Sequence, residues 1–170
     1  DDGSTDETPR QMEAISMADS KFTSIFLSRN FGHQNALSAG MQIARGTEGI
    51  FIIDGDLQDP PELLLEFYPY LVKDYDVIYA VRKKRKEGLI KRFAYKMYYR
   101  IQKRLSNIDI PVDSGDFSLI SRRAADTLNS IPEESRYIRG LRTWIGFKQI
   151  GIEYDRGRRE FDDLRFVAVY

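Results

Sequence analysis

The sequence predicts one α/β domain over residues 1–170, with a doubly wound, mostly parallel sheet flanked by helices in the manner of Rossmann-like folds. Three observations support this fold class. A chain of 170 residues has the length of a single domain, and its content of 42% hydrophobic and 12% aromatic residues is typical of a packed globular core. In the first half of the chain, patterns typical of short apolar strands alternate with patterns typical of amphipathic helices.

Two helices and two strands are expected in the first half. The spacing of apolar residues predicts helices over 8–18 and 33–44 and strands over 22–27 and 49–53. The side chains expected to be buried by these helices are Met12, Ile15 and Met17 in the first and Leu37, Met41 and Ile43 in the second. The run from Gly49 to Ile53 is continuous and rich in β-branched residues, which predicts a strand buried on both faces.

The second half is expected to add three strands and four helices. Pro60 and Pro61 predict the start of a helix, with Asp59 as its N-cap and with Leu63, Leu64, Phe67 and Leu71 as its apolar residues. Strands are expected over 76–81, 117–121 and 149–154, and helices over 89–105, 122–129 and 137–145. Sheets of this type normally open with a buried strand, whereas this sequence opens in an acidic turn at Asp1. We therefore expect a first strand upstream of the sequence given.

The formal net charge of zero conceals a basic block. Residues 1–81 hold 5 Lys and Arg against 14 Asp and Glu, whereas residues 82–104 hold 11 against 1. In the helix expected over 89–105, basic and tyrosine side chains flank an apolar stripe, which is typical of a helix lying on an anionic membrane surface. Such a stripe also suits contact with a protein core, and the charge alone would also suit nucleic acid.

The absence of cysteine excludes disulfide frameworks, thiolate metal sites and a cysteine nucleophile, and it fits a reducing compartment. The sequence has no run of about 18 apolar residues, and it does not open with a basic segment followed by an apolar one. The residues given therefore predict neither a membrane-spanning helix nor a secretion signal.

The motif Asp54-Gly55-Asp56 follows the buried strand, at the edge where α/β sheets bind ligands. Two carboxylates around a glycine can converge on Mg²⁺ or Mn²⁺, and a metal held by so few carboxylates commonly takes further ligands from substrate phosphates. The alternative is a solvated turn that caps the next helix. An EF-hand loop is excluded because Asp59 and Leu65 stand where it needs Gly and Glu. A phosphatase that uses Asp54 as nucleophile and Asp56 as general acid remains open.

Three weaker patterns accompany this motif. The glycine-containing acidic turn at 1–6 has side chains that could bind a base and ribose. Asp116, at the start of an expected strand, could accept a proton from an attacking group. The arginines of 154–159, together with Arg82 at the end of a strand, suit phosphate oxygens. Ordinary turns and surface ion pairs are the alternatives for all three. His33, which is expected to begin a helix, is predicted to be solvated or to cap that helix.

Taken in order, these strings resemble the family 2 glycosyltransferases, and within them the polyprenyl-phosphate branch, which includes dolichol-phosphate mannosyltransferases and bacterial undecaprenyl-phosphate glycosyltransferases. The strings that carry the resemblance are Asp1-Asp2-Gly3-Ser4-Thr5-Asp6, Ser28-Arg29-Asn30-Phe31-Gly32, Asp54-Gly55-Asp56-Leu57-Gln58-Asp59-Pro60-Pro61-Glu62, Asp113-Ser114-Gly115-Asp116-Phe117, Arg139-Gly140 and Tyr154-Asp155-Arg156-Gly157-Arg158. The resemblance covers the chain from Asp1 to about Phe161.

The resemblance implies a GT-A fold that lacks its first strand here, and it implies a reaction. A sugar would pass from a UDP- or GDP-sugar to a polyprenyl or dolichyl phosphate, with inversion, at the cytoplasmic face of a membrane of the cell envelope. The roles implied by motif are nucleotide binding by Asp2, Arg29 and Asp54, binding of Mg²⁺ or Mn²⁺ by the DxD motif Asp54 and Asp56 with Gln58, catalysis by Asp116, and phosphate binding by Arg82, Arg156 and Arg158.

The partners expected are therefore a nucleotide-sugar donor, a lipid-phosphate acceptor and a membrane surface that contacts the basic helix 89–105. No nucleic acid is expected, although a basic nucleic-acid-binding module is the non-enzymatic alternative to the transferase. A homo-oligomer is compatible with the sequence. Inactivity of the residues given by themselves is also compatible with it, because the missing strand would contribute part of the nucleotide pocket.

Overall fold

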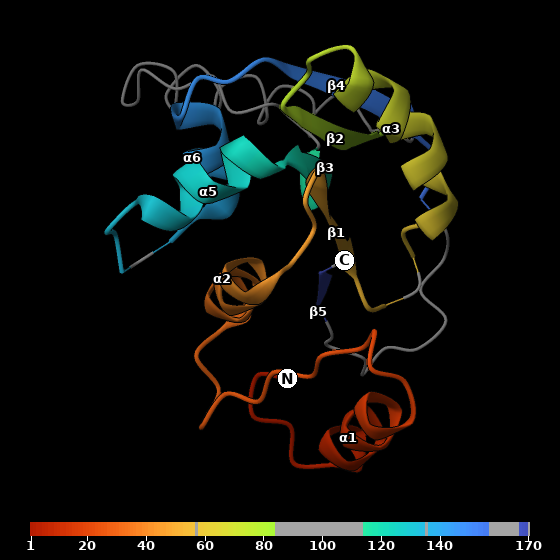
Figure 1. The fold of residues 1–170 in the computed structure, drawn as a ribbon, viewed down its shortest axis with the longest axis vertical. Coiled ribbons are helices and arrows are strands. Elements are labelled where there is room, and N and C mark those ends of the chain that lie inside the picture. The colour runs from red at the N-terminus through yellow and green to blue at the C-terminus, as the bar shows by residue number, and fades with distance from the viewer. Residues whose placement is uncertain (57, 84–113, 135, 157–166, 170) are drawn as a thin grey trace, which may run out of the picture.

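The computed structural model describes residues 1–56, 58–83, 114–134, 136–156 and 167–169 (Figure 1). Its elements are, in chain order, α1 (Thr8–Ala18), α2 (His33–Ile43), β1 (Gly49–Asp54), the 3₁₀ helix η1 (Pro61–Leu63), α3 (Leu64–Val72), β2 (Val77–Arg82), β3 (Ser114–Ser121), α5 (Arg122–Ser130), α6 (Ile138–Trp144), β4 (Gln149–Tyr154) and β5 (Val167–Val169). The basic helix predicted over 89–105 lies outside the described residues.

The five strands form one mixed sheet in the order β4-β2-β3-β1-β5. β2 and β4 pair in parallel, whereas β3 runs antiparallel to both of its neighbours, β1 and β2, and β5 runs antiparallel to β1. The α/β class is confirmed, but the expectation of a mostly parallel sheet is wrong. The physical reason is that β3 enters the sheet between β1 and β2 from the opposite direction, which strand and helix periodicity along the chain does not reveal.

The direction of the strands decides where polar residues gather. Because β1, β2 and β4 run the same way, their carboxyl ends lie at one edge of the sheet, and the amino end of the antiparallel β3 lies there too. The opposite edge holds the amino ends of β1, β2 and β4 and the carboxyl end of β3. Asp54, Arg82, Asp116 and Tyr154 fall at the first of these edges.

Helices cover both faces of the sheet, and each face has its own apolar cluster. α2, α5 and α6 lie over one face and α3 over the other (Figure 1). Ile50 and Ile52 of β1 point to the first cluster, and Phe51 and Ile53 point to the second. The prediction of a strand buried on both faces is therefore confirmed, and Leu37 and Met41 of α2 are fully buried as expected.

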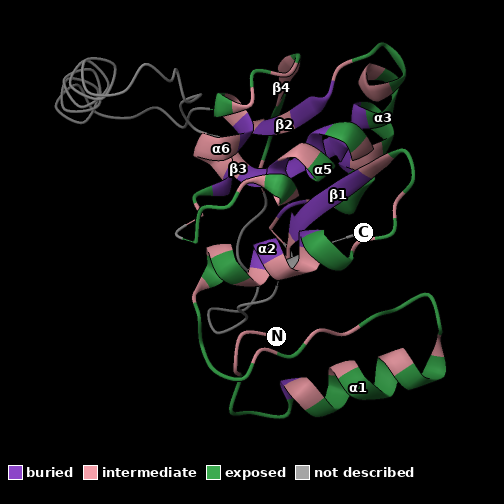
Figure 2. Ribbon diagram, turned by 60° about the vertical axis from the view of Figure 1, so that its left-hand side comes forward, coloured by how far each residue is buried: buried purple, intermediate pink, exposed green. Residues whose placement is uncertain are grey.

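The N-terminal part differs from the prediction in two ways. Residues 22–27 form no strand, since their backbone pairs with Asp1 through Leu27 and Ile25 rather than with a strand of the sheet. α1 forms where predicted but lies apart from the sheet, with its surface largely exposed (Figure 2). Met17 is 80% exposed and Ile15 49% exposed. Their expected burial is wrong, because the amphipathic pattern indicates an apolar face without specifying a surface to cover it.

Ile43 is exposed as well, so only two of the three residues expected to point inward from α2 do so. Ile43 is the last residue of α2, where the helix leaves the sheet. Among the described helices, none combines the length and the hydropathy needed to cross a lipid bilayer.

Candidate functional site

Four elements bring polar residues to one edge of the sheet. Asp54 ends β1, Arg82 ends β2 and is in register with Tyr154 at the end of β4, and Asp116 lies near the start of β3. The register Ile52↔Ser118, continued along both antiparallel strands, sets Asp54 against Asp116. Ligands of α/β sheets commonly bind at the carboxyl ends of strands. This edge is therefore the candidate site.

Asp54 and Asp56 converge on the guanidinium of Arg156. Nη2 of Arg156 lies 3.8 Å from Oδ2 of Asp54 and 3.3 Å from Oδ2 of Asp56. Nε of Arg156 lies 3.1 Å from Oδ1 of Asp59, which also accepts a hydrogen bond from the Tyr154 hydroxyl. Burial and the hydrogen bond to Asp59 raise the pKa of Tyr154, so it stays a donor. We define this group of residues, 54, 56, 59, 154 and 156, as the acidic cluster.

The role predicted for Asp59 is wrong. Asp59 is buried and its carboxylate binds Tyr154 and Arg156, whereas Pro60 precedes η1 and no side chain caps that helix. The charge of Arg156 attracts Asp59 into the acidic cluster, and this long-range ion pair replaces the local helix cap that the sequence suggested. The helix itself begins at Pro61, as the two prolines predict.

The carboxylates of the acidic cluster carry oxygen atoms of the kind that bind small divalent cations. Oδ1 of Asp54 is buried and has no hydrogen-bond partner among the described residues. Burial raises the pKa of Asp54, since removal from water disfavours the ionised carboxylate. The described residues contain no group of three or more His, Cys, Asp or Glu side chains that could hold a metal. Two carboxylates still suit Mg²⁺ or Mn²⁺ if phosphate oxygens and water supply the other ligands.

Gln58 lies beside this pair of carboxylates. Its backbone N–H donates to Oδ1 of Asp56 at 3.1 Å, which shapes the turn after β1. Arg158, predicted to bind phosphate, lies outside the described residues. Arg82 is exposed at the end of β2, and its guanidinium lies beside Gly115, since a Cβ added to this glycine would be in ordinary van der Waals contact with Nη2, at 3.6 Å. Arg82 and Arg156 therefore both lie at the candidate edge.

Asp116 is held by residues from two helices. Its Oδ2 lies 3.1 Å from Nε2 of His33 and accepts a hydrogen bond of 2.9 Å from Nε2 of Gln34, both at the start of α2. Its Oδ1 lies 3.4 Å from Nε of Arg139 in α6. Burial acts to raise the pKa of Asp116, but the hydrogen bond from His33 and the charge of Arg139 outweigh it and hold that pKa below its usual range. Asp116 is therefore ionised at neutral pH.

Sequence reasoning missed three of these contacts. His33 was expected to be solvated or to cap a helix; it is exposed as expected, but it also contacts Asp116, which was not predicted. No function was predicted for Gln34 or Arg139. His33 and Asp116 are 83 residues apart in the chain. No local pattern reports a contact over that distance.

The acidic turn at the N-terminus packs against the segment that leads into α2. Asp2 accepts hydrogen bonds from the backbone N–H groups of Phe31 at 2.6 Å and Gly32 at 2.8 Å. Gly3 has φ of 74° and approaches the backbone of Arg29 so closely that a side chain would not fit. The guanidinium of Arg29 lies 4.1 Å from the ring centre of Phe31. Asp2 and Arg29 therefore lie near each other, and their role in nucleotide binding stays a prediction.

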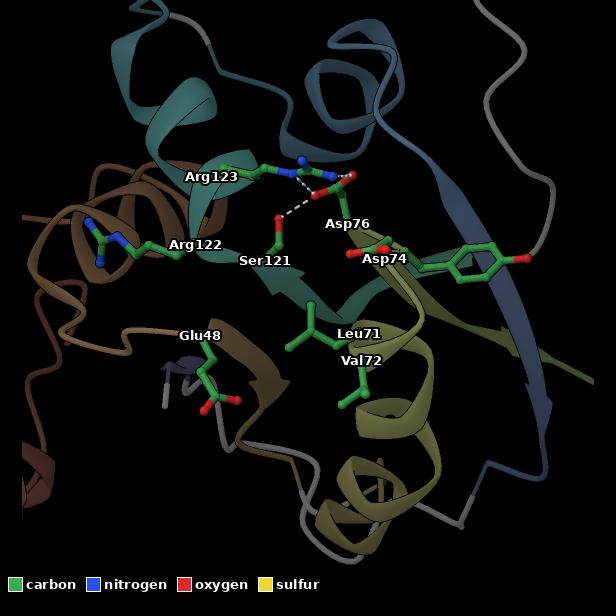
Figure 3. Close-up of a pocket in the computed structure, with 9 residues that line it drawn as sticks. Glu48, Leu71, Val72, Asp74, Asp76, Ser121, Arg122 and Arg123 are labelled. Carbon is green, nitrogen blue, oxygen red and sulfur yellow. Dashed lines mark hydrogen bonds and ion pairs between the residues drawn. The ribbon is translucent and has the colours of Figure 1, made fainter.

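A pocket of about 410 Å³ lies at the opposite edge of the sheet (Figure 3). Leu71 and Val72 of α3 line one side of it, and the ion pair between Asp76 and Arg123 lines another (Figure 3). None of the predicted site residues lines this pocket. Among its charged groups, Asp76 is paired with Arg123, and Arg122 with Asp126. The pocket is separate from the candidate site.

Comparisons with known proteins agree with the geometry. The family described as Glycosyl transferase family 2 matches residues 1–128. Uncharacterized glycosyltransferase YkcC of Bacillus subtilis is 44% identical over 166 residues, which cover 97% of this chain and 51% of that protein. The prophage bactoprenol glucosyl transferase homolog of Escherichia coli is 34% identical over 170 residues, covering 97% of this chain and 54% of that protein.

A third relative, the bactoprenol glucosyl transferase of Shigella phage SfV, is 32% identical over 163 residues, which cover 93% of this chain and 52% of that protein. The chain thus spans about half the length of the curated relatives it matches. The family match extends over the acidic turn, the Asp54-Gly55-Asp56 motif and Asp116. The chain belongs to glycosyl transferase family 2, and its helix-flanked mixed sheet is consistent with the GT-A fold of such transferases.

Proposed function

We propose that the protein containing this chain transfers a sugar, with inversion, from a UDP- or GDP-sugar to a polyprenyl phosphate. The observation that carries this proposal is the convergence of Asp54 and Asp56 on one guanidinium, at the edge of the sheet that also presents Asp116. A diphosphate needs positive charge and a sugar acceptor needs a positioned carboxylate. Both kinds of group are present within one edge of the domain.

The donor side of the site is the acidic cluster with the acidic turn. Asp54 and Asp56, assisted by Gln58, would hold Mg²⁺ or Mn²⁺, and a cation there would neutralise charge that develops on the departing nucleoside diphosphate. Arg156 is already at this position, and Arg82 and Arg158 would supply further contacts to phosphate. Asp2 and Arg29 would contact the base or ribose, together with Asp54.

The acceptor side of the site contains Asp116. A phosphate acceptor is ionised before it reacts, so Asp116 needs little strength as a base and acts mainly by orienting the acceptor oxygen. The names of the bactoprenol relatives favour a polyprenyl phosphate as acceptor. Such an acceptor lies in a membrane, and the basic segment 89–105 would contact the anionic lipid surface, which we place at the cytoplasmic face.

The test of the donor site compares two chemically matched substitutions in the full-length protein. Asp56→Asn removes one carboxylate of the pair, whereas Asp126→Asn makes the same change in an exposed ion pair on α5. We expect Asp56→Asn to abolish sugar transfer to undecaprenyl phosphate and Mn²⁺-dependent binding of UDP or GDP in calorimetry, with the circular dichroism spectrum unchanged. Asp126→Asn should retain both activities.

Normal transfer by Asp56→Asn would contradict the assigned metal role. Release of phosphate from simple esters, without any need for a nucleotide sugar, would favour the phosphatase alternative. Salt-sensitive binding to polynucleotides without a divalent metal would favour the nucleic-acid-binding alternative.

The membrane contact is tested separately. Simultaneous neutralisation of Lys91, Arg92, Lys96 and Arg100 should weaken binding of the full-length protein to anionic liposomes, because each basic residue near such a surface contributes about 1 kcal/mol. Flotation assays at low and high salt measure this effect. Binding that responds to neither salt nor the substitutions would exclude an electrostatic role for the segment.

A further inference from the structure

The first two residues of α2 are both directed at one oxygen of Asp116. Nε2 of His33 and Nε2 of Gln34 lie 3.1 Å and 2.9 Å from Oδ2. His33 is the single histidine of the chain. The loop that leads into α2 is itself held by hydrogen bonds from Phe31 and Gly32 to Asp2. These two donors are therefore presented from an anchored helix start.

Gln34 is fixed at both ends of its amide group. Its nitrogen donates to Asp116, while its oxygen accepts a hydrogen bond of 2.8 Å from the backbone N–H of Ile138, the first residue of α6. The first N–H groups of a helix have no partner within the helix, so this contact serves α6 as well. One side chain of α2 thereby links β3 to α6, and the two contacts determine which end of the amide faces Asp116.

The two oxygens of Asp116 differ in their surroundings. Oδ2 receives two donors, whereas Oδ1 is buried and makes no hydrogen bond among the described residues. Oδ1 lies in the field of Arg139 at 3.4 Å. Rotation about the last torsion of an aspartate side chain is only weakly restricted by its own geometry. Two donors on one oxygen therefore determine the direction in which the other oxygen points.

We propose that His33 and Gln34 are positioning residues that clamp Oδ2 of Asp116 and so fix the orientation of this carboxylate with respect to the sugar acceptor. This inference deepens the proposed function and rests on it for the identity of the reaction. Neither residue needs to touch the substrate. Each acts through Asp116, and the loss of either frees the carboxylate to rotate while leaving its charge and the rest of the domain in place.

The imidazole of His33 is also an internal reporter of the clamp. The hydrogen bond to Asp116 raises the pKa of His33, against the opposing effect of its partial burial. The other charged groups that act on the ring are Asp54 from β1, which raises the pKa, and Arg139 from α6, which lowers it. Neutralisation of Asp116 should therefore lower the pKa of His33.

The first experiment needs no enzymatic activity. Full-length protein labelled with ¹⁵N-histidine is titrated by NMR, and the His33 signal is identified by its loss in His33→Gln. We expect the His33 pKa to lie above its ordinary value of about 6.5 in the wild type and to fall in Asp116→Asn. An unchanged pKa in Asp116→Asn would overturn the proposed contact, whatever reaction the protein catalyses.

The second experiment measures transfer kinetics. His33→Ala and Gln34→Leu should each lower kcat by about tenfold or more, with the KM for the nucleotide sugar nearly unchanged, since misorientation of a reacting group affects the chemical step. His33→Gln keeps a side-chain N–H donor and should restore most of kcat. Gln42→Leu, an exposed substitution in the same helix, is the matched control.

The results separate the inference from the proposed function. Normal kcat in both His33→Ala and Gln34→Leu would overturn the clamp. If His33→Ala or Gln34→Leu fails to fold, two measurements take its place. These are the kinetics of His33→Gln, which keeps a side-chain donor at the helix start, and the NMR titration of the wild type and Asp116→Asn. A wild type that transfers no sugar refutes the proposed function alone, and the titration then decides whether the His33 contact with Asp116 exists.

Discussion

Arg142 is a charged side chain in a place that disfavours charge. It lies in α6 with 1% of its surface exposed, and none of its three guanidinium nitrogens has a hydrogen-bond partner among the described residues. Two interactions partly offset the cost of burying this charge: the ring of Tyr79, whose centre lies 5.1 Å from Cζ of Arg142, and the charge of Asp116. Burial lowers the pKa of Arg142 to about 10. We predict that Arg142→Met stabilises the fold.

The pKa shift gives the size of the effect. A lowering of this extent corresponds to about 3 kcal/mol that burial of the charged form costs the folded state, as an order of magnitude. Loss of the contact with Tyr79 offsets about 1 kcal/mol of the gain. Replacement of this buried ion by an apolar side chain of similar length should therefore raise the free energy of unfolding by about 1–2 kcal/mol at pH 7.

The sign of the pH dependence is a second check. A base whose pKa is lower in the folded state destabilises the fold at every pH below that value, and the destabilisation disappears as pH rises through the folded pKa. The advantage of Arg142→Met in urea unfolding should thus be complete at pH 7 and should shrink above about pH 10. Arg10→Met, at an exposed position in α1, should have little effect. A less stable Arg142→Met protein at pH 7 would refute the reasoning.

Two further predictions concern paired groups. Asp76 is buried and accepts hydrogen bonds from Arg123 and from the Ser121 hydroxyl, which hold its pKa below the usual range. Asp76→Asn should therefore lower the free energy of unfolding by about 1–3 kcal/mol at pH 7, as measured by urea unfolding. The difference from the wild type should vanish as pH falls through the lowered pKa, and a difference that persists in acid would contradict the prediction. Tyr154→Phe removes the hydroxyl that donates to Asp59 and should lower the free energy of unfolding by about 1 kcal/mol, with an unchanged Tm counting against a structural role for that bond.

The sequence predicts secondary structure well where local rules decide it. β1 forms where a continuous apolar run requires burial on both faces, and α5 begins where Ser121 caps it by accepting a hydrogen bond from the Ala124 N–H. Whether a strand runs parallel or antiparallel to its neighbours cannot be predicted in this way, because the apolar pattern of a strand is the same in both cases. The antiparallel entry of β3 depends on its partners β1 and β2, which lie far away in the chain.

In the candidate site, too, some residues are predictable from local sequence and others are not. Asp54 and Asp56 could be predicted because a glycine between two aspartates after a buried strand is a local signal. The partners of Asp116 could not, since His33, Gln34 and Arg139 come from two helices that reach it only in the folded chain. Asp59 shows the converse case, in which a plausible local cap is replaced by a long-range ion pair with Arg156.

The charges around the two halves of the site are unequal, and the inequality matches the proposed ligands. Among the described residues of the acidic cluster, three carboxylates lie around the guanidinium of Arg156, and this predominance of negative charge suits the cation that we propose there. Asp116 is instead surrounded by His33, Arg139 and Arg142, so a second anion can approach it at less electrostatic cost than it would meet beside Asp54. An acceptor phosphate carries such a charge, whereas an uncharged sugar hydroxyl would gain nothing from it. The field at this edge therefore supports our proposal of a phosphate acceptor on the side of Asp116 and of a cation with the donor diphosphate on the side of Asp54.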